Sequence, residues 1–189
     1  MTEMTEVSVP RTAAPPIAAS SSVAPSTLSR RWRAIPPLVV VSLVILGGQV
    51  KERPNFAGAN LSGVRMIADL PGVDLHGASL SRAKLGVDIK NQGMGQMRTD
   101  LSGANLAGAD LHEADLNRSL MTFADLKGAN LRGVNFFRVK LAGADLTGAD
   151  VAGADFTEAD LEGTVLRGVK GFEAARGMDR ALNGDKAVR

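Results

Sequence analysis

Two histidines and a series of aspartates are the residues of this 189-residue sequence that could do chemistry. His76 and His112 lie far apart without HExxH-type spacing, and the chain has no cysteine, so a catalytic zinc site would lack its usual ligands. Thiol nucleophiles, disulfides and iron–sulfur clusters are excluded for the same reason. Gly93 and Gly95 lack the following lysine and serine of a phosphate loop. We therefore predict no catalytic residue, no metal and no cofactor.

The aspartates follow a structural pattern. All eleven between residues 55 and 171 directly precede the central apolar residue of a five-residue repeat. General acid–base catalysis needs a carboxyl group in an unusual environment, which a regularly repeated outward position does not supply. Short polar side chains in such a position can instead bond neighbouring backbone groups. From residue 101 the apolar centres are Leu101, Leu106, Leu111, Leu116, Met121, Leu126, Leu131, Phe136, Leu141, Leu146, Val151, Phe156, Leu161 and Leu166.

The composition of each unit predicts its local shape. With the centre called i, position i−2 is small or β-branched, i−1 is polar, and i+2 is often glycine. Two inward side chains around one outward side chain fit a short extended segment, and glycine suits the corner that follows. A period of five fits neither an α-helix nor a long strand. The register also covers Phe56, Leu61 and Met66, and it then slips by one residue to Leu70.

The A(D/N)LxG units, such as residues 104–108 and 144–148, closely resemble the pentapeptide-repeat family over about residues 55–171. The resemblance implies an all-β fold, a right-handed quadrilateral parallel β-helix (a solenoid) in which four pentapeptides form one coil. Residues twenty apart then stack on each other. Phe136 and Phe156 are accordingly expected in one column, and Met121 is expected to stack on Leu141 and Leu161.

The N-terminal part of the chain is unlike the repeat. Residues 1–33 are rich in Pro, Ser, Thr and Ala and predict a disordered arm. Residues 34–50 carry no charge and reach the short end of a transmembrane helix, so we expect a single-pass membrane anchor in contact with the lipid bilayer. A removable signal peptide and a strand packed on the first coil are the alternatives. Arg30, Arg31, Trp32 and Arg33 suit the membrane interface.

The distribution of basic residues around the apolar span predicts its orientation. Arg30, Arg31 and Arg33 precede the span, whereas Lys51 and Arg53 follow it. Because positive charge is retained on the cytoplasmic side, the N-terminus is expected in the cytoplasm and the repeat outside it. Export of the whole chain and a cytoplasmic location are the alternatives.

Two departures from the 51–171 repeat are further candidates for binding. Residues 90–98 interrupt the register, and a loop on a stiff scaffold often carries function; its candidate residues are Asn91, Gln92, Met94, Gln96 and Met97. Residues 172–189 have apolar side chains at helical spacing, which predicts a short C-terminal helical cap over the open end of the β-helix. A homodimerisation element is the alternative role of this segment.

Three apolar residues occupy outward positions that usually hold aspartate, glycine or charge. They are Leu120, Phe123 and Phe137, and together they form a predicted interaction patch. The alternative is that they are isolated exposed apolar residues, which are common on protein surfaces.

These features predict a non-enzymatic, membrane-anchored scaffold or protein-interaction module with an unknown protein partner. The alternative, from gyrase-protecting members of the same family, is a cytoplasmic DNA-mimic regulator of a type II topoisomerase. That mechanism uses a strongly acidic rod, whereas residues 55–171 hold 14 acidic and 12 basic residues. The net charge of +2 gives no reason to expect direct nucleic-acid binding.

Overall fold

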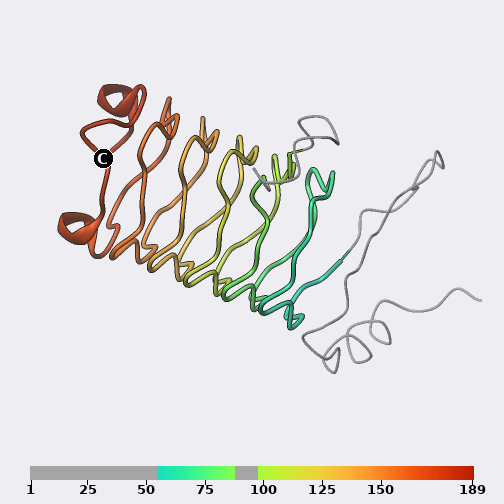
Figure 1. Ribbon diagram of the computed structural model, residues 1–189. Helices are drawn as coiled ribbons and strands as arrows, with labels where there is room; N and C mark the ends of the chain where they lie inside the picture. The colour runs from blue at the N-terminus through green and yellow to red at the C-terminus, as the bar shows by residue number, and fades with distance from the viewer. Residues whose placement is uncertain (1–54, 88–97) are drawn as a thin grey trace, which may run out of the picture.

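The computed structural model describes residues 55–87 and 98–189, which form a four-sided stack of coils (Figure 1). Each side of a coil pairs with the next coil through one parallel bridge, so the faces are ladders of isolated bridges without longer strands. In the regular part the bridged residues are twenty apart, as in Asn105 to Asp125 and Asp125 to Asp145. The predicted four-unit coil is therefore confirmed.

We name the four faces by their outward, bridged residues. The corner between two faces, formed by positions i+1 and i+2 of a unit, is called the AB, BC, CD or DA edge. Face A holds Asn55, Asp74, Asn105, Asp125, Asp145, Val165 and Val188; face B holds Asn60, Ser79, Asp110, Asn130, Asp150 and Lys170; face C holds Arg65, Lys84, Asp115, Asn135, Asp155 and Arg176; and face D holds Asp69, Asp100, Leu120, Lys140, Asp160 and Leu182.

Backbone hydrogen bonds give every position of the unit a defined role. The N–H of Leu126 donates to the carbonyl of Asp145 at 2.8 Å, and the N–H of Asp145 donates to Ala124 at 2.9 Å. The N–H of Ala129 then closes the corner on the carbonyl of Leu126 at 3.1 Å. Position i+2 lies in this corner, where the backbone takes a positive φ that glycine adopts without a steric penalty.

Inward side chains fill the prism. The central leucines, phenylalanines and Met121 from residue 70 to 161 are at most 4% exposed, and alanines occupy most of the i−2 positions around them. Phe136 and Phe156 stack with ring centroids 5.1 Å apart and an interplanar angle of 23°. The predicted aromatic column is thus present, and the narrow core packs with only small side chains between its large ones.

Both irregularities in the repeat fall on the CD edge. Asn55 pairs with Asp74, nineteen residues later, because the corner between Arg65 and Asp69 is one residue short. Asp74 pairs with Asn105, thirty-one residues later, because the extra residues lie between Lys84 and Asp100. The one-residue slip predicted after Met66 is confirmed, and the insertion leaves the ladder on the other edges in register.

The C-terminal segment differs from the prediction. It contains no helix longer than three residues: η3 is Phe172–Ala174 and η4 is Gly184–Lys186, both 3-10 turns. The segment instead continues the ladder through Arg176, Leu182 and Val188. The expected helical cap is wrong because Gly171, Gly177 and Asn183 have φ values of 70°, 72° and 56°, which interrupt any helix.

Several predicted features lie outside the described residues. These are the arm at 1–33 with its interface residues Arg30, Arg31, Trp32 and Arg33, the apolar span at 34–50, and the loop residues 90–97 with Asn91, Gln92, Met94, Gln96 and Met97. In the part of the chain that the structure describes, no helix has both the length and the apolar character needed to cross a membrane.

Candidate interaction surface

The outward aspartates and asparagines stabilise the corners. In fourteen of the described units, the side-chain oxygen at i−1 accepts a hydrogen bond from the backbone N–H two residues later. Asparagine amides also bond the aspartate of the adjacent coil, as from Asn130 to Asp110 at 2.8 Å. These contacts confirm the backbone-bonding role predicted for this position.

The electrostatics of these carboxylates do not suit acid catalysis. The N–H of Ala152, together with Arg132, holds the pKa of Asp150 below its ordinary value. Burial by itself would raise the pKa of Asp110, but hydrogen bonds from His112 and Asn130 lower it below the ordinary value. Carboxyls such as these stay ionised near neutral pH and cannot act as proton donors there.

The histidines likewise have local partners. The Nδ1 atom of His76 lies 3.0 Å from the carbonyl oxygen of Ala107, and Nδ1 of His112 lies 2.9 Å from Asp110. Glu113 turns away from this pair to Arg82, at 2.8 Å. Among the described residues no three metal-binding side chains converge.

The edges of the prism differ in the residues that they place at i+2. The AB edge has glycine in every described unit, whereas the CD edge has Arg118, Arg138 and Glu158 at φ values of 57° to 59°. An L-residue in this left-handed region costs about 1–2 kcal/mol relative to ordinary conformations. Such strain is typical of positions whose side chains are needed for function. The glycines of the AB edge are Gly58, Gly77, Gly108, Gly128, Gly148 and Gly168.

Phe123 is the most prominent of the predicted patch residues. Its side chain is 76% exposed, and its φ is 58° in a DA-edge column that otherwise holds Gly72, Gly103, Gly143 and Gly163. A Cβ atom added to Gly143 would approach its ring to 2.5 Å, so the ring lies against the next coil over this glycine. A large aromatic side chain therefore stays in water although its backbone is strained.

Leu120 and Phe137 are half-buried. Leu120 lies on face D between Asp100 and Lys140, and Phe137 lies on the CD edge of the next coil. The guanidinium of Arg138 lies 4.9 Å from the centre of the Phe137 ring and 2.6 Å from Glu158. The three predicted residues therefore follow face D from one edge to the other, which we call the face D patch.

The sequence-based prediction missed two polar residues on the CD edge. Asn117 is 7% exposed, and its Oδ1 atom has no hydrogen-bond partner within the described chain; the same holds for Nε of Arg118. Buried polar atoms are normally paired, so this corner is unusual. The available signal was the absence of glycine at i+2 in three units spaced by twenty residues.

The ends of the insertion are joined by a hydroxyl group. Thr99 occupies an i−2 position, and its Oγ1 donates to the carbonyl of Leu85 at 2.5 Å. In a regular unit, a backbone N–H makes this bond. Gly86 packs so closely that an added Cβ atom would lie 2.8 Å from the backbone nitrogen of Asn117. These two contacts let the prism continue across the interruption.

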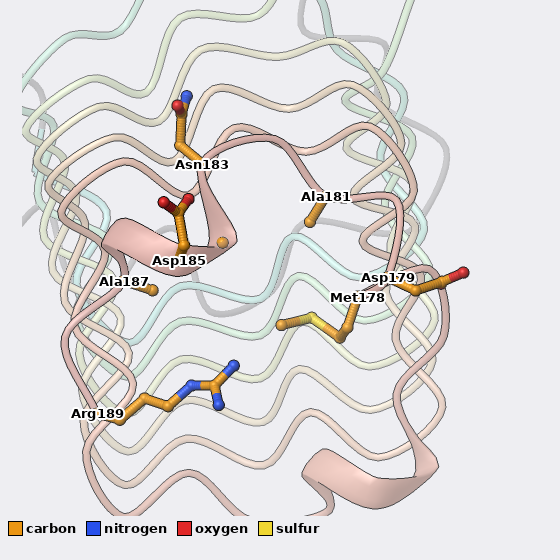
Figure 2. A pocket seen from close by; sticks show the side chains of 8 residues that line it. Met178, Asp179, Ala181, Asn183, Asp185, Ala187 and Arg189 are labelled. Atoms are coloured by element: carbon orange, nitrogen blue, oxygen red, sulfur yellow. The ribbon is translucent and has the colours of Figure 1, made fainter.

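The C-terminal end of the prism contains a shallow hollow of about 480 Å³ (Figure 2). Met178, Ala181 and Ala187 line it together with the polar residues Asn183 and Arg189. In the view along the prism, Met178 and Arg189 point across the open end, and no further coil covers them. Asp179 and Asp185 also line the hollow, so its charged groups are two carboxylates and the guanidinium of Arg189.

The repeat geometry now identifies the family. The sequence pattern described as "Pentapeptide repeats" matches residues 55–86, 99–136 and 135–170 in eight copies. The chain is a pentapeptide-repeat protein. This match leaves out residues 87–98, and the extra residues of the CD edge lie in this interval. No curated protein matches the chain.

Solved pentapeptide-repeat proteins provide the comparison of folds. HetL, involved in heterocyst differentiation regulation in the cyanobacterium Nostoc, is 31% identical with a TM-score of 0.44, covering 72% of this chain and 60% of HetL. Rfr23 from the cyanobacterium Cyanothece is 27% identical with a TM-score of 0.33, covering 64% and 90%. The fluoroquinolone resistance protein QnrB1 is 21% identical with a TM-score of 0.33, covering 69% and 72%. The pentapeptide-repeat chain therefore spans less than two thirds of HetL.

Proposed function

We propose that this pentapeptide-repeat protein is a non-enzymatic scaffold that binds a protein partner through the face D patch and is held at a membrane by residues 34–50. The binding surface is proposed mainly because of Phe123. This residue is 76% exposed and has a φ of 58°, at a position where the neighbouring coils have glycine. Folding alone favours glycine there, whereas an exposed aromatic ring is a typical anchor of a protein interface.

The surroundings of Phe123 support a docking face. Face D is bounded by Phe123 on one edge and Phe137 on the other, with Leu120 between them. Arg138 covers Phe137, and Lys140 is paired with Asp160 at 3.1 Å, so polar groups surround the apolar residues. An apolar centre within a polar rim is the usual composition of such an interface.

Photo-crosslinking tests the face D patch. A photoreactive phenylalanine is placed at position 123 and, as a matched control, at Thr147 on the AB edge. We expect a discrete crosslinked product from position 123 alone, reduced several-fold when Leu120 is also changed to Glu. Equal products from the two positions, or a product insensitive to Leu120→Glu, contradict the proposed surface.

The membrane part of the proposal depends on the sequence alone. Residues 34–50 are uncharged, Arg30, Arg31 and Arg33 precede them, and Lys51 and Arg53 follow them, so we expect the N-terminus in the cytoplasm and the repeat outside it. We expect the full chain to sediment with membranes and to resist alkaline carbonate. The double variant Val40→Arg with Leu43→Arg is the control and should be released. A native-size chain found wholly in the cytosol excludes the anchor.

The topoisomerase alternative has less support from the charges. It requires an acidic surface, but Lys127 lies 3.3 Å from both Asp125 and Asp145, and Arg132 lies 3.1 Å from Asp150. Cations therefore partly neutralise faces A and B. A supercoiling assay with purified gyrase tests this alternative, and an effect at micromolar concentrations of the full chain supports it over the scaffold.

A further inference from the structure

The N-terminal end of the prism is less covered than its interior. Phe56, Leu61 and Met66, the centres of the first coil, are half-buried, whereas Leu75, Leu80 and Leu85 in the next coil are at most 1% exposed. Each centre of the first coil thus leaves apolar surface exposed at this end. Burial of such surface is favourable, so the end is suited to an apolar cover.

Ile67 extends this apolar end to the CD edge. Ile67 is 41% exposed and lies between the bridged residues Arg65 and Asp69, which are four positions apart instead of five. Further along the same edge, the corner at Thr157 and Glu158 has two polar side chains in the outward positions. The shortened corner therefore adds a large branched side chain to the end of the prism.

Charge distinguishes this end from the remainder of the molecule. Residues 51–87 contain five basic and three acidic side chains, whereas residues 98–189 contain twelve basic and fourteen acidic ones. The sequence from residue 51 to 87 therefore has a net charge of +2, whereas residues 98–189 have a net charge of −2. Surfaces that combine apolar and basic groups bind anionic lipid interfaces through the burial of apolar area and through electrostatic attraction.

The chain preceding the prism places its N-terminal end close to the membrane. Only residues 51–54 separate the apolar span at 34–50 from Asn55, the first bridged residue. Fully extended, the steps from residue 50 to 55 reach about 17 Å. If the span is anchored in a bilayer, the first coil cannot move away from the headgroup region by more than this distance.

We propose that the anionic lipid interface covers the N-terminal end of the prism, with Phe56, Leu61, Met66 and Ile67 against the membrane and the rod directed away from it. The inference rests on the proposed anchor at 34–50. It goes further, because an anchor alone would leave the orientation of the rod unspecified. Face D and the open C-terminal end then extend away from the bilayer.

The absence of cysteine in the native chain allows a direct test. Ile67→Cys and, as a matched control at the opposite end, Leu182→Cys are labelled with an environment-sensitive fluorophore in the full chain. Leu182 is apolar, 49% exposed and lies in the last coil. Both proteins are reconstituted into vesicles of phosphatidylcholine with about a third phosphatidylglycerol, which carry a nitroxide quencher near the headgroups.

We expect the label at position 67 to be quenched at least two-fold more than the label at 182, and the difference to shrink in vesicles without phosphatidylglycerol. Equal quenching in protein that floats with the vesicles overturns the inference but leaves the anchor intact. Failure to float overturns the anchor. A label at position 67 that is already shielded before lipid is added shows that residues 38–46 cover this end, which also overturns the inference.

Discussion

The AB and CD edges follow the same five-residue repeat but use it differently. Every described AB corner has glycine at the position of positive φ, whereas the CD edge has a shortened corner, the insertion after Val87 and then Arg118, Arg138 and Glu158. The AB edge shows what the fold requires by itself. The CD edge shows the most departures from those requirements, and Arg82 and Glu113 on the BC edge and Phe123 on the DA edge also replace glycine at a positive φ.

The contrast between the two edges separates corner positions that stabilise the fold from corner positions that are suited to binding. A glycine corner meets the backbone requirement at no steric cost, so the AB edge is close to the most stable solution. Long side chains in the same conformation reduce stability and present chemical groups to solvent. We infer that the CD edge and face D are used for binding and that the AB edge is mainly structural.

The largest expected effect is common to both edges. Phe136→Ala beneath the CD edge should lower the free energy of unfolding by about 3–5 kcal/mol, and Leu146→Ala beneath the AB edge by about 2–5 kcal/mol, because each side chain is fully buried. Chemical denaturation measures both. If either substitution left the free energy of unfolding unchanged, the two edges would not share one core, and the comparison between them would fail.

The next effect concerns the closure of the insertion. Thr99→Val keeps the shape of the side chain but leaves the carbonyl of Leu85 without its hydroxyl donor. We expect the free energy of unfolding to fall by about 1–3 kcal/mol. Thr122→Val is the control, because the Thr122 hydroxyl bonds Ser102 at 3.0 Å on a half-buried part of the surface. Equal thermal shifts for the two variants would show that the hydroxyl of Thr99 does not hold the CD edge together.

Substitutions at i+2 should have opposite signs on the two edges. A Cβ atom added by Gly148→Ala would have no other atom within 4 Å. The expected loss of about 1–2 kcal/mol in the free energy of unfolding therefore comes from the φ of 71° alone. Arg118→Gly relieves a φ of 59° and removes an unpaired buried Nε, and we expect a gain of about 0.5–1 kcal/mol. Chemical denaturation of both variants gives the sign of each change in the free energy of unfolding. A lower free energy of unfolding for Arg118→Gly would contradict the proposed strain.

Acidification should have the smallest effect and should not distinguish the edges. Burial raises the pKa of Asp145 and Asp155, but hydrogen bonds from Thr147 and Thr157, respectively, outweigh it and leave both pKa values below normal. A lowered folded-state pKa stabilises the protein above the normal aspartate pKa of about 3.9 and ceases to do so as the pH falls through the folded value.

We therefore expect a constant Tm above about pH 5 and a fall below about pH 4. Asp145→Asn next to the AB edge and Asp155→Asn next to the CD edge keep an oxygen acceptor but do not titrate. Each should reduce the acid-dependent fall in Tm by a similar small amount. If only one of the two substitutions reduced the acid-dependent fall in Tm, the edges would differ in electrostatics as well as in backbone strain.

Much of the fold could be predicted from the sequence because the repeat is local. The pattern around Leu126 or Leu146 specifies which side chains point inward, and the backbone bonds of one unit are repeated in the next. The twenty-residue spacing placed Phe136 over Phe156, and the slip after Met66 appeared where the sequence predicted it. The aspartates were correctly interpreted as partners of the backbone.

The candidate site was predictable only in part. Phe123 and Leu120 were recognised as apolar residues in outward positions, but their exposure differs because Leu120 lies within the ladder and Phe123 in a corner. Asn117 was missed because it packs against Gly86, which approaches from the preceding coil. At the C-terminus, helical spacing gave the wrong structure because residues with positive φ interrupt it.

The sequence by itself determined the unit and its inward and outward positions, because both depend on contacts repeated every five residues, and the resemblance to the family supplied the length of a regular coil. Only the tertiary structure decided that the shortened corner, the insertion and the strained corners at Arg118, Arg138 and Glu158 share one edge. That arrangement depends on where the chain rejoins the ladder at Thr99 and Asp100, and a hydroxyl bond between residues fourteen positions apart fixes this point.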